Sequence, residues 1–319
     1  MYLRIFSVFV IILGLCGFWG KGISPIPKPP IEPPYMSMET PWADSLMQTM
    51  SLDEKIGQLF MVAANGRDTD ETYYLMIDSL IENYGLGGLI YFQAKPHDHN
   101  LLVNRFQSKS TIPMMNGIDG EWGLAMRIDS LKAYPWNMTL GAIQNEELLY
   151  EMGAAMAQEC MTMGIHFNFA PVVDVNSNPL NPIINARSYG ERPKNVSKKA
   201  LALIRGMQDA GVLACAKHFP GHGDTESDSH KTLPVINHSK ERIDSVDLIP
   251  FKHLIDAGVA SVMVAHLNIP SLDSVENRAS TLSPYIVDTM LRQQLNFNGL
   301  TFTDALNMKG VSYFYESGR

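Results

Sequence analysis

Short apolar runs alternate with longer amphipathic segments along the chain after residue 50. The apolar runs have the length and composition of buried strands, and they are Gln58–Ala63, Gly87–Phe92, Met114–Ile118, Phe167–Val173, Val212–His218, Ser261–His266 and Leu300–Thr303. The segments between them repeat apolar residues at helical spacing, and they include Glu71–Tyr84, Glu146–Met163, Val196–Ala210, Lys240–Ala257 and Pro284–Leu295. Ser51 and Glu54 have the spacing of a capping box, which predicts a helix start there.

Continuous apolar strands separated by helices imply a parallel sheet that is buried on both faces. Periodicity alone leaves two architectures open, a closed barrel and an open doubly wound sheet. We favour the barrel, because polar and reactive residues follow many of the strands instead of gathering at one crevice. The predicted fold is therefore α/β, a (β/α)8 TIM-type barrel, although the pattern contains seven strands and not eight.

The first 50 residues differ from the rest. Residues 1–22 have a positive start at Arg4 and an apolar stretch too short for a stable membrane span, which is typical of an export signal. Cys16 is a candidate lipoprotein site that would attach the protein to a membrane, but the bulky Leu15 precedes it where a small residue is wanted. Residues 23–50 form a lead-in with six prolines between residues 24 and 34, which predicts an extended tether. The expected location is the periplasm or cell envelope.

Composition limits the classes of molecule that the protein is expected to bind. The formal net charge of −8 argues against nucleic acid or an anionic membrane surface. Cys160 and Cys215 lie in apolar runs and are predicted core thiols, so no disulfide framework is implied. Residues 51–319 offer room for one large domain or two ordinary ones, and we assign them to one barrel domain.

The segment from Lys217 to His230 concentrates three histidines and three acidic residues directly after a predicted strand. A solvated surface loop is one interpretation, and a metal site is a second, although no helical pair of histidines or paired Cys-x-x-Cys accompanies it. In the third, Asp228 and His230 face the same way in extended chain, and the carboxylate orients the imidazole for proton transfer. Glycines at 221 and 223 would let such a loop swing over a substrate.

The run Lys217-His218-Phe219-Pro220-Gly221-His222-Gly223-Asp224-Thr225, followed by Asp228-Ser229-His230, resembles the signature of glycoside hydrolase family 3, in its bacterial β-N-acetylglucosaminidase (β-hexosaminidase) branch. The resemblance implies the same barrel, and it implies that Asp228 and His230 supply the general acid/base. It also places the motif around Asp304 at the end of the seventh strand. We therefore expect the chain to stop in the following helix, with the last βα unit absent.

Asp304 directly follows the apolar run Leu300–Thr303. One interpretation of Asp304 is a helix N-cap. By resemblance to the family, it is the nucleophile of a retaining glycosidase. The resemblance gives sugar-binding roles to five further residues, Asp119, Arg127, Arg187, Lys217 and His218. Their alternative readings are a surface salt bridge for Asp119 with Arg127, and a buried structural network for the others. Where the family more often has Asp-Gln-Glu-Gly-Gly, this chain has Asp119-Gly120-Glu121-Trp122-Gly123, and Trp122 could stack on a sugar face.

Four other polar residues receive lesser roles. Asp174 is expected to be structural, ordering neighbouring loops and the arginine, and His266 is expected to line the pocket wall. His97 and His99 match no motif and are expected to be surface histidines.

Together these features predict an exported, retaining, exo-acting β-N-acetylglucosaminidase that acts on short oligosaccharides or peptidoglycan fragments. It would need no metal or organic cofactor, its partner would be a carbohydrate substrate, and a longer chain would carry a downstream domain. The alternative from another class is a non-catalytic barrel that binds sugar or serves as a scaffold, or an inactive fragment.

Overall fold

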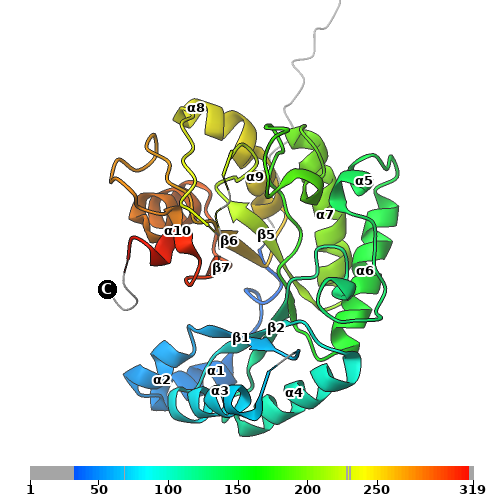
Figure 1. Cartoon of the computed structure of the whole chain (residues 1–319), viewed down its shortest axis with the longest axis vertical. Coiled ribbons are helices and arrows are strands. Elements are labelled where there is room, and N and C mark those ends of the chain that lie inside the picture. Colours follow the sequence, from blue (N-terminus) through cyan, green and yellow to red (C-terminus); the bar gives the residue numbers. More distant parts are fainter. Residues whose placement is uncertain (1–31, 68, 228, 230, 316–319) are drawn as a thin grey trace, which may run out of the picture.

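The computed structural model describes residues 32–67, 69–227, 229 and 231–315. Its seven strands are all parallel and lie in one sheet in chain order (Figure 1). The strands are β1 Met61–Asn65, β2 Gly88–Phe92, β3 Met115–Ile118, β4 Phe167–Asn168, β5 Leu213–Phe219, β6 Ser261–Val264 and β7 Leu300–Thr303. The sheet curls and carries its helices on the outside, which confirms the predicted α/β barrel architecture.

Helices precede, connect and follow the strands. The longer ones are α1 Pro41–Thr49, α3 Glu71–Tyr84, α4 Pro96–Lys109, α6 Glu147–Thr162, α7 Pro193–Asp209, α9 Leu248–Asp256 and the π-helical η5 Tyr285–Gln294. Shorter ones are α2 Leu52–Gly57, α5 Asn137–Gly141, α8 Lys240–Arg242 and α10 Lys309–Ser312, with η1 Leu124–Met126, η2 Asn185–Arg187, η3 Ile243–Asp247 and η4 Ser280–Leu282. Ser51 forms the predicted capping box with Glu54 at the start of α2.

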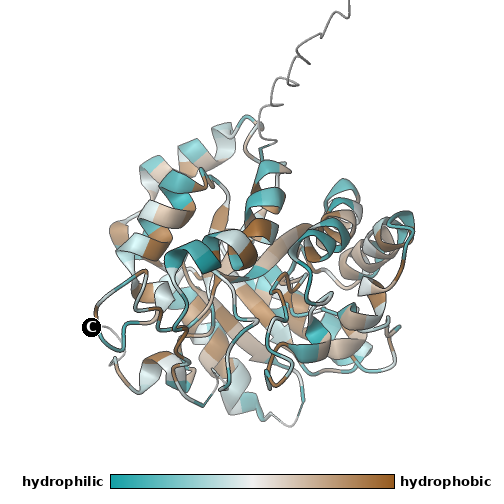
Figure 2. Cartoon of the chain, turned by 90° about the horizontal axis from the view of Figure 1, so that it is seen from above, coloured by the Kyte–Doolittle hydropathy of each residue, from teal (hydrophilic) through white to brown (hydrophobic). Residues whose placement is uncertain are grey.

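The hydrophobic core has two parts. One lies between the sheet and its helices, where apolar residues of α6, α7 and α9 pack on β5 and β6, and those of α3 and α4 pack on β2 and β3. The other lies on the concave side, where Phe167, Phe169 and Phe302 form a cluster with ring centroids about 5 Å apart. Figure 2 shows this layering, with hydrophobic strands in the middle and helices whose outer faces are hydrophilic. Cys160 and Cys215 are buried free thiols, as predicted.

Two strands differ from the predicted ranges. β1 begins at Met61, because residues 58–60 complete the turn that ends α2, and the Gln58 amide donates to the Glu54 carbonyl. Regular strand β4 covers only Phe167 and Asn168. The chain beyond β4 still hydrogen-bonds to β5, but Pro171 has no N–H to donate and the ladder becomes irregular there.

The predicted helix Lys240–Ala257 is present as three consecutive pieces. A π-helical turn, η3, separates α8 from α9, and in it the Leu248 amide donates to the Ile243 carbonyl. Pro250 explains the widening, because a proline ring in a regular α-helix clashes with the carbonyl four residues earlier.

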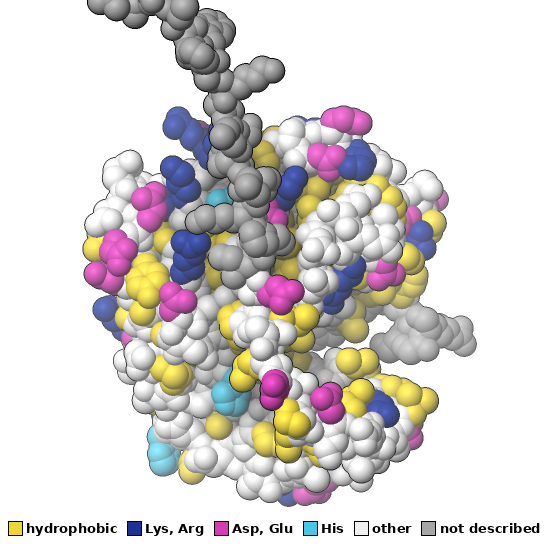
Figure 3. Space-filling view, turned by 180° about the vertical axis from the view of Figure 1, so that it is seen from behind, with side chains coloured by type: hydrophobic (Ala, Val, Ile, Leu, Met, Phe, Trp, Pro, Cys, Tyr) yellow, Lys and Arg dark blue, Asp and Glu magenta, His cyan; other side chains and the backbone are white. Residues whose placement is uncertain are grey.

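Strands β1 and β7 form the two edges of the sheet, and no described strand lies between them. Figure 3 shows hydrophobic side chains on the back of the molecule around the notch between these edges. Leu59 and Phe60 before β1, and Leu306 after β7, are exposed apolar residues of this region. The curled sheet therefore has the form of a TIM-type barrel left open at one seam.

Part of the predicted tether is folded onto the barrel. The Tyr35 hydroxyl donates to the Ala260 carbonyl at 2.6 Å and accepts from the Leu300 amide at 2.7 Å, so the lead-in reaches the start of β7. Helix α1 follows directly. None of the described helices is long and apolar enough to cross a bilayer. The predicted signal and Cys16 lie outside the described residues.

Candidate active site

Polar side chains gather beyond the carboxyl ends of the strands, the position where parallel barrels place their functional residues. Strand β5 carries Lys217 and His218 near its carboxyl end, and β7 is followed by Asp304. The other members follow β3, β4 and β6, and they are Asp119, Glu121, Arg127, Asp174, Arg187 and His266. The structure therefore brings segments that are far apart in sequence to one end of the barrel.

Asp119 accepts hydrogen bonds from two cationic side chains. Lys217 donates to its Oδ1 at 2.8 Å, and Arg127 donates to its Oδ2 at 3.0 Å. The Arg127 guanidinium also lies over the Phe92 ring, 4.7 Å from the centroid. Asp119 and Arg127 are 16% and 19% exposed, so the predicted pair exists but lies recessed at the barrel mouth and not on the open surface.

Glu121 completes this network, although the sequence analysis assigned it no role. Its carboxylate accepts two hydrogen bonds from Arg187, at 2.8 and 2.9 Å, and lies 2.9 Å from Lys217 Nζ. Burial raises the pKa of Glu121, but Lys217 and Arg187 outweigh burial and hold the pKa well below its usual range. Glu121 is therefore a buried anion that fixes the guanidinium of Arg187. Its position two residues after Asp119 was the available signal.

Asp174 orders the turn after β5, as predicted. Its fully buried carboxylate accepts from the His218 amide at 3.2 Å, from the His222 amide at 2.7 Å, and bonds His218 Nδ1 at 2.7 Å. The other ring nitrogen of His218 lies 3.4 Å from Arg187 Nη2. Asp174 therefore reaches Arg187 through His218, whereas Glu121 makes the bidentate contact with Arg187.

The segment from Phe219 to Thr225 is packed and not free to swing. His222 is 1% exposed, and its ring nitrogens lie 2.9 Å from the hydroxyls of Thr225 and Ser229. Burial lowers the pKa of His222 to about 4, so the ring is neutral at pH 7. A Cβ on Gly223 would lie 1.8 Å from the Val175 carbonyl oxygen. Gly223 therefore serves close packing, which corrects the mobile role predicted for it.

Asp304 presents a partly exposed carboxylate directly after β7. Its amide donates to the Val264 carbonyl at 2.9 Å, and its Oδ1 accepts from the Ala305 amide at 2.8 Å. Burial raises the pKa of Asp304, but His218, His266, the Ala305 amide and Lys217 together hold the pKa below its usual range. The alternative reading as a helix N-cap was wrong, because α10 begins later, with Met308 at its N-cap.

His266 is fully buried near Asp304, and its expected place in the pocket wall stays a prediction. Its Nε2 bonds the Ala305 carbonyl at 3.0 Å, and its Nδ1 bonds the Thr281 hydroxyl at 2.8 Å. Because a carbonyl only accepts, Nε2 carries the proton and Nδ1 accepts from Thr281. His266 therefore holds the peptide unit that follows Asp304.

Asp228 and His230 lie outside the described residues, so their pairing stays a prediction. Across residues 32–67, 69–227, 229 and 231–315, no group of three or more His, Cys, Asp or Glu side chains could hold a metal ion. The described part of the chain thus gives the metal interpretation of this loop no support.

The prediction that His99 lies at the surface needs correction. His99 is fully buried, with Nε2 bonded to the Met163 carbonyl at 2.9 Å, whereas His97 is exposed as expected. Helix α4 turns His99 toward the core, where its ring packs against Tyr91. One face of Trp122 is covered by Trp136, and stacking of a sugar on Trp122 stays a prediction.

Asp247 should make stability depend on pH. It is packed against Gly221, its Oδ2 accepts from Arg242 at 3.0 Å, and its buried Oδ1 has no partner. Burial raises its pKa from 3.8 to about 6; Arg242 opposes that shift and Asp224 adds to it. The folded state thus binds the proton more tightly than the unfolded chain, and the free energy of unfolding should fall as pH rises from about 4 to about 6.

Asp247→Asn should remove this contribution. Urea unfolding of both proteins between pH 4 and pH 8 measures it, and the variant should gain stability relative to the parent protein as pH rises through the interval and then level off. A difference in stability that is constant with pH would contradict the assignment.

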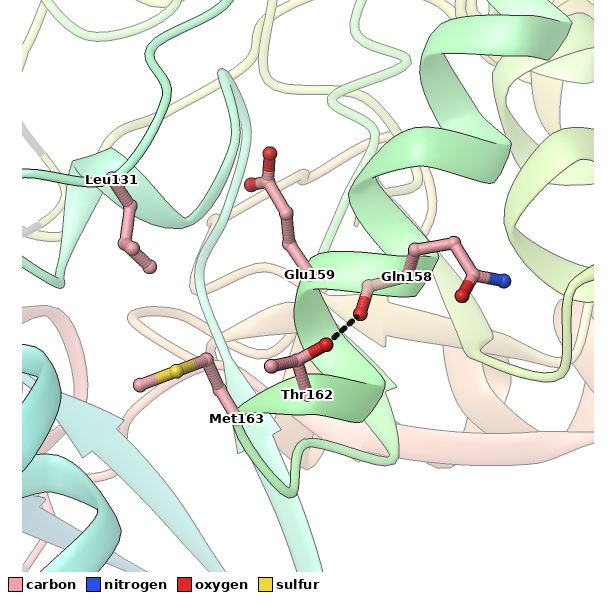
Figure 4. A pocket seen from close by; sticks show the side chains of 5 residues that line it. All are labelled: Leu131, Gln158, Glu159, Thr162 and Met163. Atoms are coloured by element: carbon pink, nitrogen blue, oxygen red, sulfur yellow. Dashed lines mark hydrogen bonds between the residues drawn. The ribbon is translucent and has the colours of Figure 1, made fainter.

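A pocket of about 210 Å³ lies elsewhere, at the C-terminal end of α6 (Figure 4). Its walls are Leu131, Gln158, Glu159, Thr162 and Met163, none of which belongs to the polar cluster. Burial raises the pKa of Glu159. The pocket is mainly apolar and is not a candidate for the active site.

Comparison with known proteins agrees with this geometry. Residues 51–317 match the model of the glycosyl hydrolase family 3 N-terminal domain. A "Beta-hexosaminidase A" of Pseudoalteromonas piscicida is 39% identical over 262 residues, covering 75% of this chain and 44% of the relative. A "Beta-hexosaminidase" of Thiobacillus denitrificans is 33% identical over 268 residues, covering 81% of this chain and 72% of the relative.

Solved structures show the same fold. A family 3 β-N-acetylglucosaminidase from Paenibacillus sp. str. FPU-7 is 38% identical with a TM-score of 0.78, over 83% of this chain and 51% of the other. A beta-glucoside phosphorylase is 26% identical with a TM-score of 0.81, over 88% of this chain and 52% of the other. The chain thus spans about half the length of several of these proteins. It belongs to glycosyl hydrolase family 3 and contains the N-terminal barrel domain of that family.

Proposed function

We propose that the protein is a glycoside hydrolase of the β-N-acetylhexosaminidase type that removes terminal N-acetylglucosamine with retention of configuration. The observation that carries the proposal is the ionised carboxylate of Asp304, partly exposed at the end of β7 and within the electrostatic influence of Lys217 and His218. An ionised carboxylate at this position can attack an anomeric carbon and form a covalent glycosyl-enzyme.

The surrounding cluster supports a sugar-binding role. Arg187, Arg127 and Lys217 are held by Glu121 and Asp119 with little exposed surface, so their donors are fixed before substrate arrives. Asp119, Arg127, Arg187, Lys217 and His218 would bind hydroxyl groups and the acetamido group through these fixed donors and acceptors. Preorganisation of this kind lowers the cost of binding, because the side chains do not need to be ordered by the ligand.

Proton transfer is assigned to His230, oriented by Asp228. His230 would protonate the oxygen of the leaving group and then activate water against the glycosyl-enzyme. The substrates would be short oligosaccharides or fragments of peptidoglycan, and the location would be the periplasm or cell envelope, reached through the signal in residues 1–22 and retained by a lipid if Cys16 is modified.

The direct test compares two chromogenic substrates, 4-nitrophenyl N-acetyl-β-glucosaminide and 4-nitrophenyl β-glucoside. We expect turnover of the first and little of the second. Adding inorganic phosphate separates hydrolysis from phosphorolysis, because a phosphorylase would release the sugar as its 1-phosphate. Binding of N-acetylglucosamine without turnover of either substrate would favour the non-catalytic barrel.

His230→Ala should distinguish proton transfer from binding. Activated aryl leaving groups need little protonation, so the loss in kcat/KM should be small on them and large on a disaccharide, whose leaving alcohol is a poor one. Asp228→Asn should show a weaker form of the same defect. Equal losses on both kinds of substrate would mean that His230 binds the sugar and does not transfer a proton.

A further inference from the structure

Two tryptophans form a rigid stack on the loop that follows β3. The indole rings of Trp122 and Trp136 are parallel within 5°, with their centroids 4.8 Å apart. Trp122 is partly buried, whereas Trp136 keeps 48% of its surface exposed. Stacking covers the face of Trp136 that is turned toward Trp122, so its exposed surface belongs to the opposite face and the ring edge.

The stack is tied to the sugar-binding cluster from two sides. Trp122 directly follows Glu121, the buried partner of Arg187. Asn137, which directly follows Trp136 and is 3% exposed, donates its amide to the Arg187 carbonyl at 2.7 Å. The Tyr134 amide closes the loop between them by donating to the Trp122 carbonyl at 2.9 Å. The residue after Trp136 is thus bonded to the backbone of Arg187, and the residue before Trp122 binds the Arg187 side chain.

An exposed, rigid indole next to a cluster of fixed hydrogen-bond donors suits a pyranose ring. One face of a sugar ring presents C–H groups, which pack on a flat aromatic surface, while its hydroxyl groups stay free for polar partners. A rigid aromatic side chain also loses little conformational entropy on binding. The Trp122 stack supplies that rigidity to Trp136.

We propose that the exposed face of Trp136 is a stacking subsite for a second sugar ring, adjacent to the N-acetylglucosamine bound by Arg187 and Asp119. The inference rests on the proposed function and deepens it. Because an exo-acting enzyme takes the terminal sugar, the second ring is the leaving group. Trp136 then favours oligosaccharides over substrates with a small leaving group.

The test uses Trp136→Ala and Trp136→Phe with two substrates, N,N′-diacetylchitobiose and N-acetyl-β-glucosaminyl fluoride, which has no second ring. Trp136→Ala should raise KM for the disaccharide about tenfold and leave kcat/KM for the fluoride within about twofold, with Trp136→Phe between. Trp42→Ala is the matched control, because Trp42 is 60% exposed on α1, in another part of the molecule from α5 in Figure 1. It should change neither value.

A binding measurement separates this inference from the proposed function. Titration of the protein with chitotriose should change tryptophan fluorescence, and Trp136→Phe should reduce that change by half or more, whether or not the sugar is hydrolysed. Equal losses on the disaccharide and the fluoride, or no loss on the disaccharide, would overturn the subsite. If Trp136→Ala does not fold, the phenylalanine variant and the titration decide. Absence of turnover with intact chitotriose binding would instead overturn the proposed function.

Discussion

Replacing Asp304 with asparagine should lower kcat for 4-nitrophenyl N-acetyl-β-glucosaminide about a thousandfold or more, a loss of about 4 kcal/mol in transition-state stabilisation. The side chain keeps its size and its bond from the Ala305 amide, but a neutral amide cannot attack the anomeric carbon. Steady-state release of nitrophenol measures the loss. Asp244→Asn, at an exposed aspartate on η3, is the control and should retain full activity.

The stereochemistry of a rescued reaction tests the same assignment independently. In Asp304→Ala, sodium azide can enter the space left by the carboxylate and attack from the same side. A single displacement inverts the anomeric carbon, so the product should be the α-glycosyl azide, whereas the parent protein should release the β-sugar after two displacements. A loss of kcat smaller than about tenfold in Asp304→Asn, which is only about 1.4 kcal/mol, would remove Asp304 from the role of nucleophile.

The sequence predicted those elements whose signals are local. Helix α3 has the predicted bounds Glu71–Tyr84, because Asp70 caps its start and Gly85 ends it in the left-handed region at φ 62°. Strand β7 also matches, because Leu300–Thr303 is a short apolar run that ends on a charged residue. In both cases the residues that decide the boundary lie within a few positions of it.

Elements decided by distant contacts were harder to predict. Leu59 and Phe60 are apolar and were assigned to the first strand, yet they lie exposed at the open seam, where burial no longer follows from hydrophobicity. Pro171 interrupts the fourth strand while the extended chain around it still pairs with β5. Periodicity counts apolar residues and does not register a missing N–H group.

The site residues also divide into those with a local signal in the sequence and those whose role depends on distant contacts. The motif residues were found because Lys217 and His218 end the predicted apolar strand Val212–His218 and Asp304 directly follows Leu300–Thr303. Glu121 was missed, because its partner Arg187 lies 66 residues away, and no local pattern distinguishes a buried glutamate from a solvated one. The role of His266 was missed for a similar reason, since the Ala305 carbonyl that it holds is 39 residues away.

The buried charges give the largest expected effect on stability. Glu121→Gln should lower the free energy of unfolding by about 3–5 kcal/mol, because it leaves two recessed cations, Lys217 and Arg187, without their shared anion. Glutamine fills the same volume, so the loss reports charge and not packing. Urea or thermal unfolding followed by circular dichroism measures it.

The matched control is Asp244→Asn. The Lys240–Asp244 pair is just as short, at 2.5 Å, but its side chains are 37% and 42% exposed, and an exposed pair of this spacing contributes only about 0.3–0.5 kcal/mol. If both variants lose the same small amount, the network around Glu121 is no more important than a surface pair, and Arg187 is not held in place by it.

The pH dependence of the unfolding free energy provides a second test, and the pKa of Glu121 determines its direction. The folded-state pKa of Glu121 lies below its value of about 4.5 in the unfolded chain, so the stability that it contributes is present above pH 4.5 and is lost as pH falls. The difference in unfolding free energy between the parent protein and Glu121→Gln should therefore be greatest near neutral pH and shrink below pH 4.5. A difference that grows on acidification would mean that the Glu121 carboxyl is protonated in the folded protein, and Arg187 would then need another anion to fix its guanidinium beside the sugar.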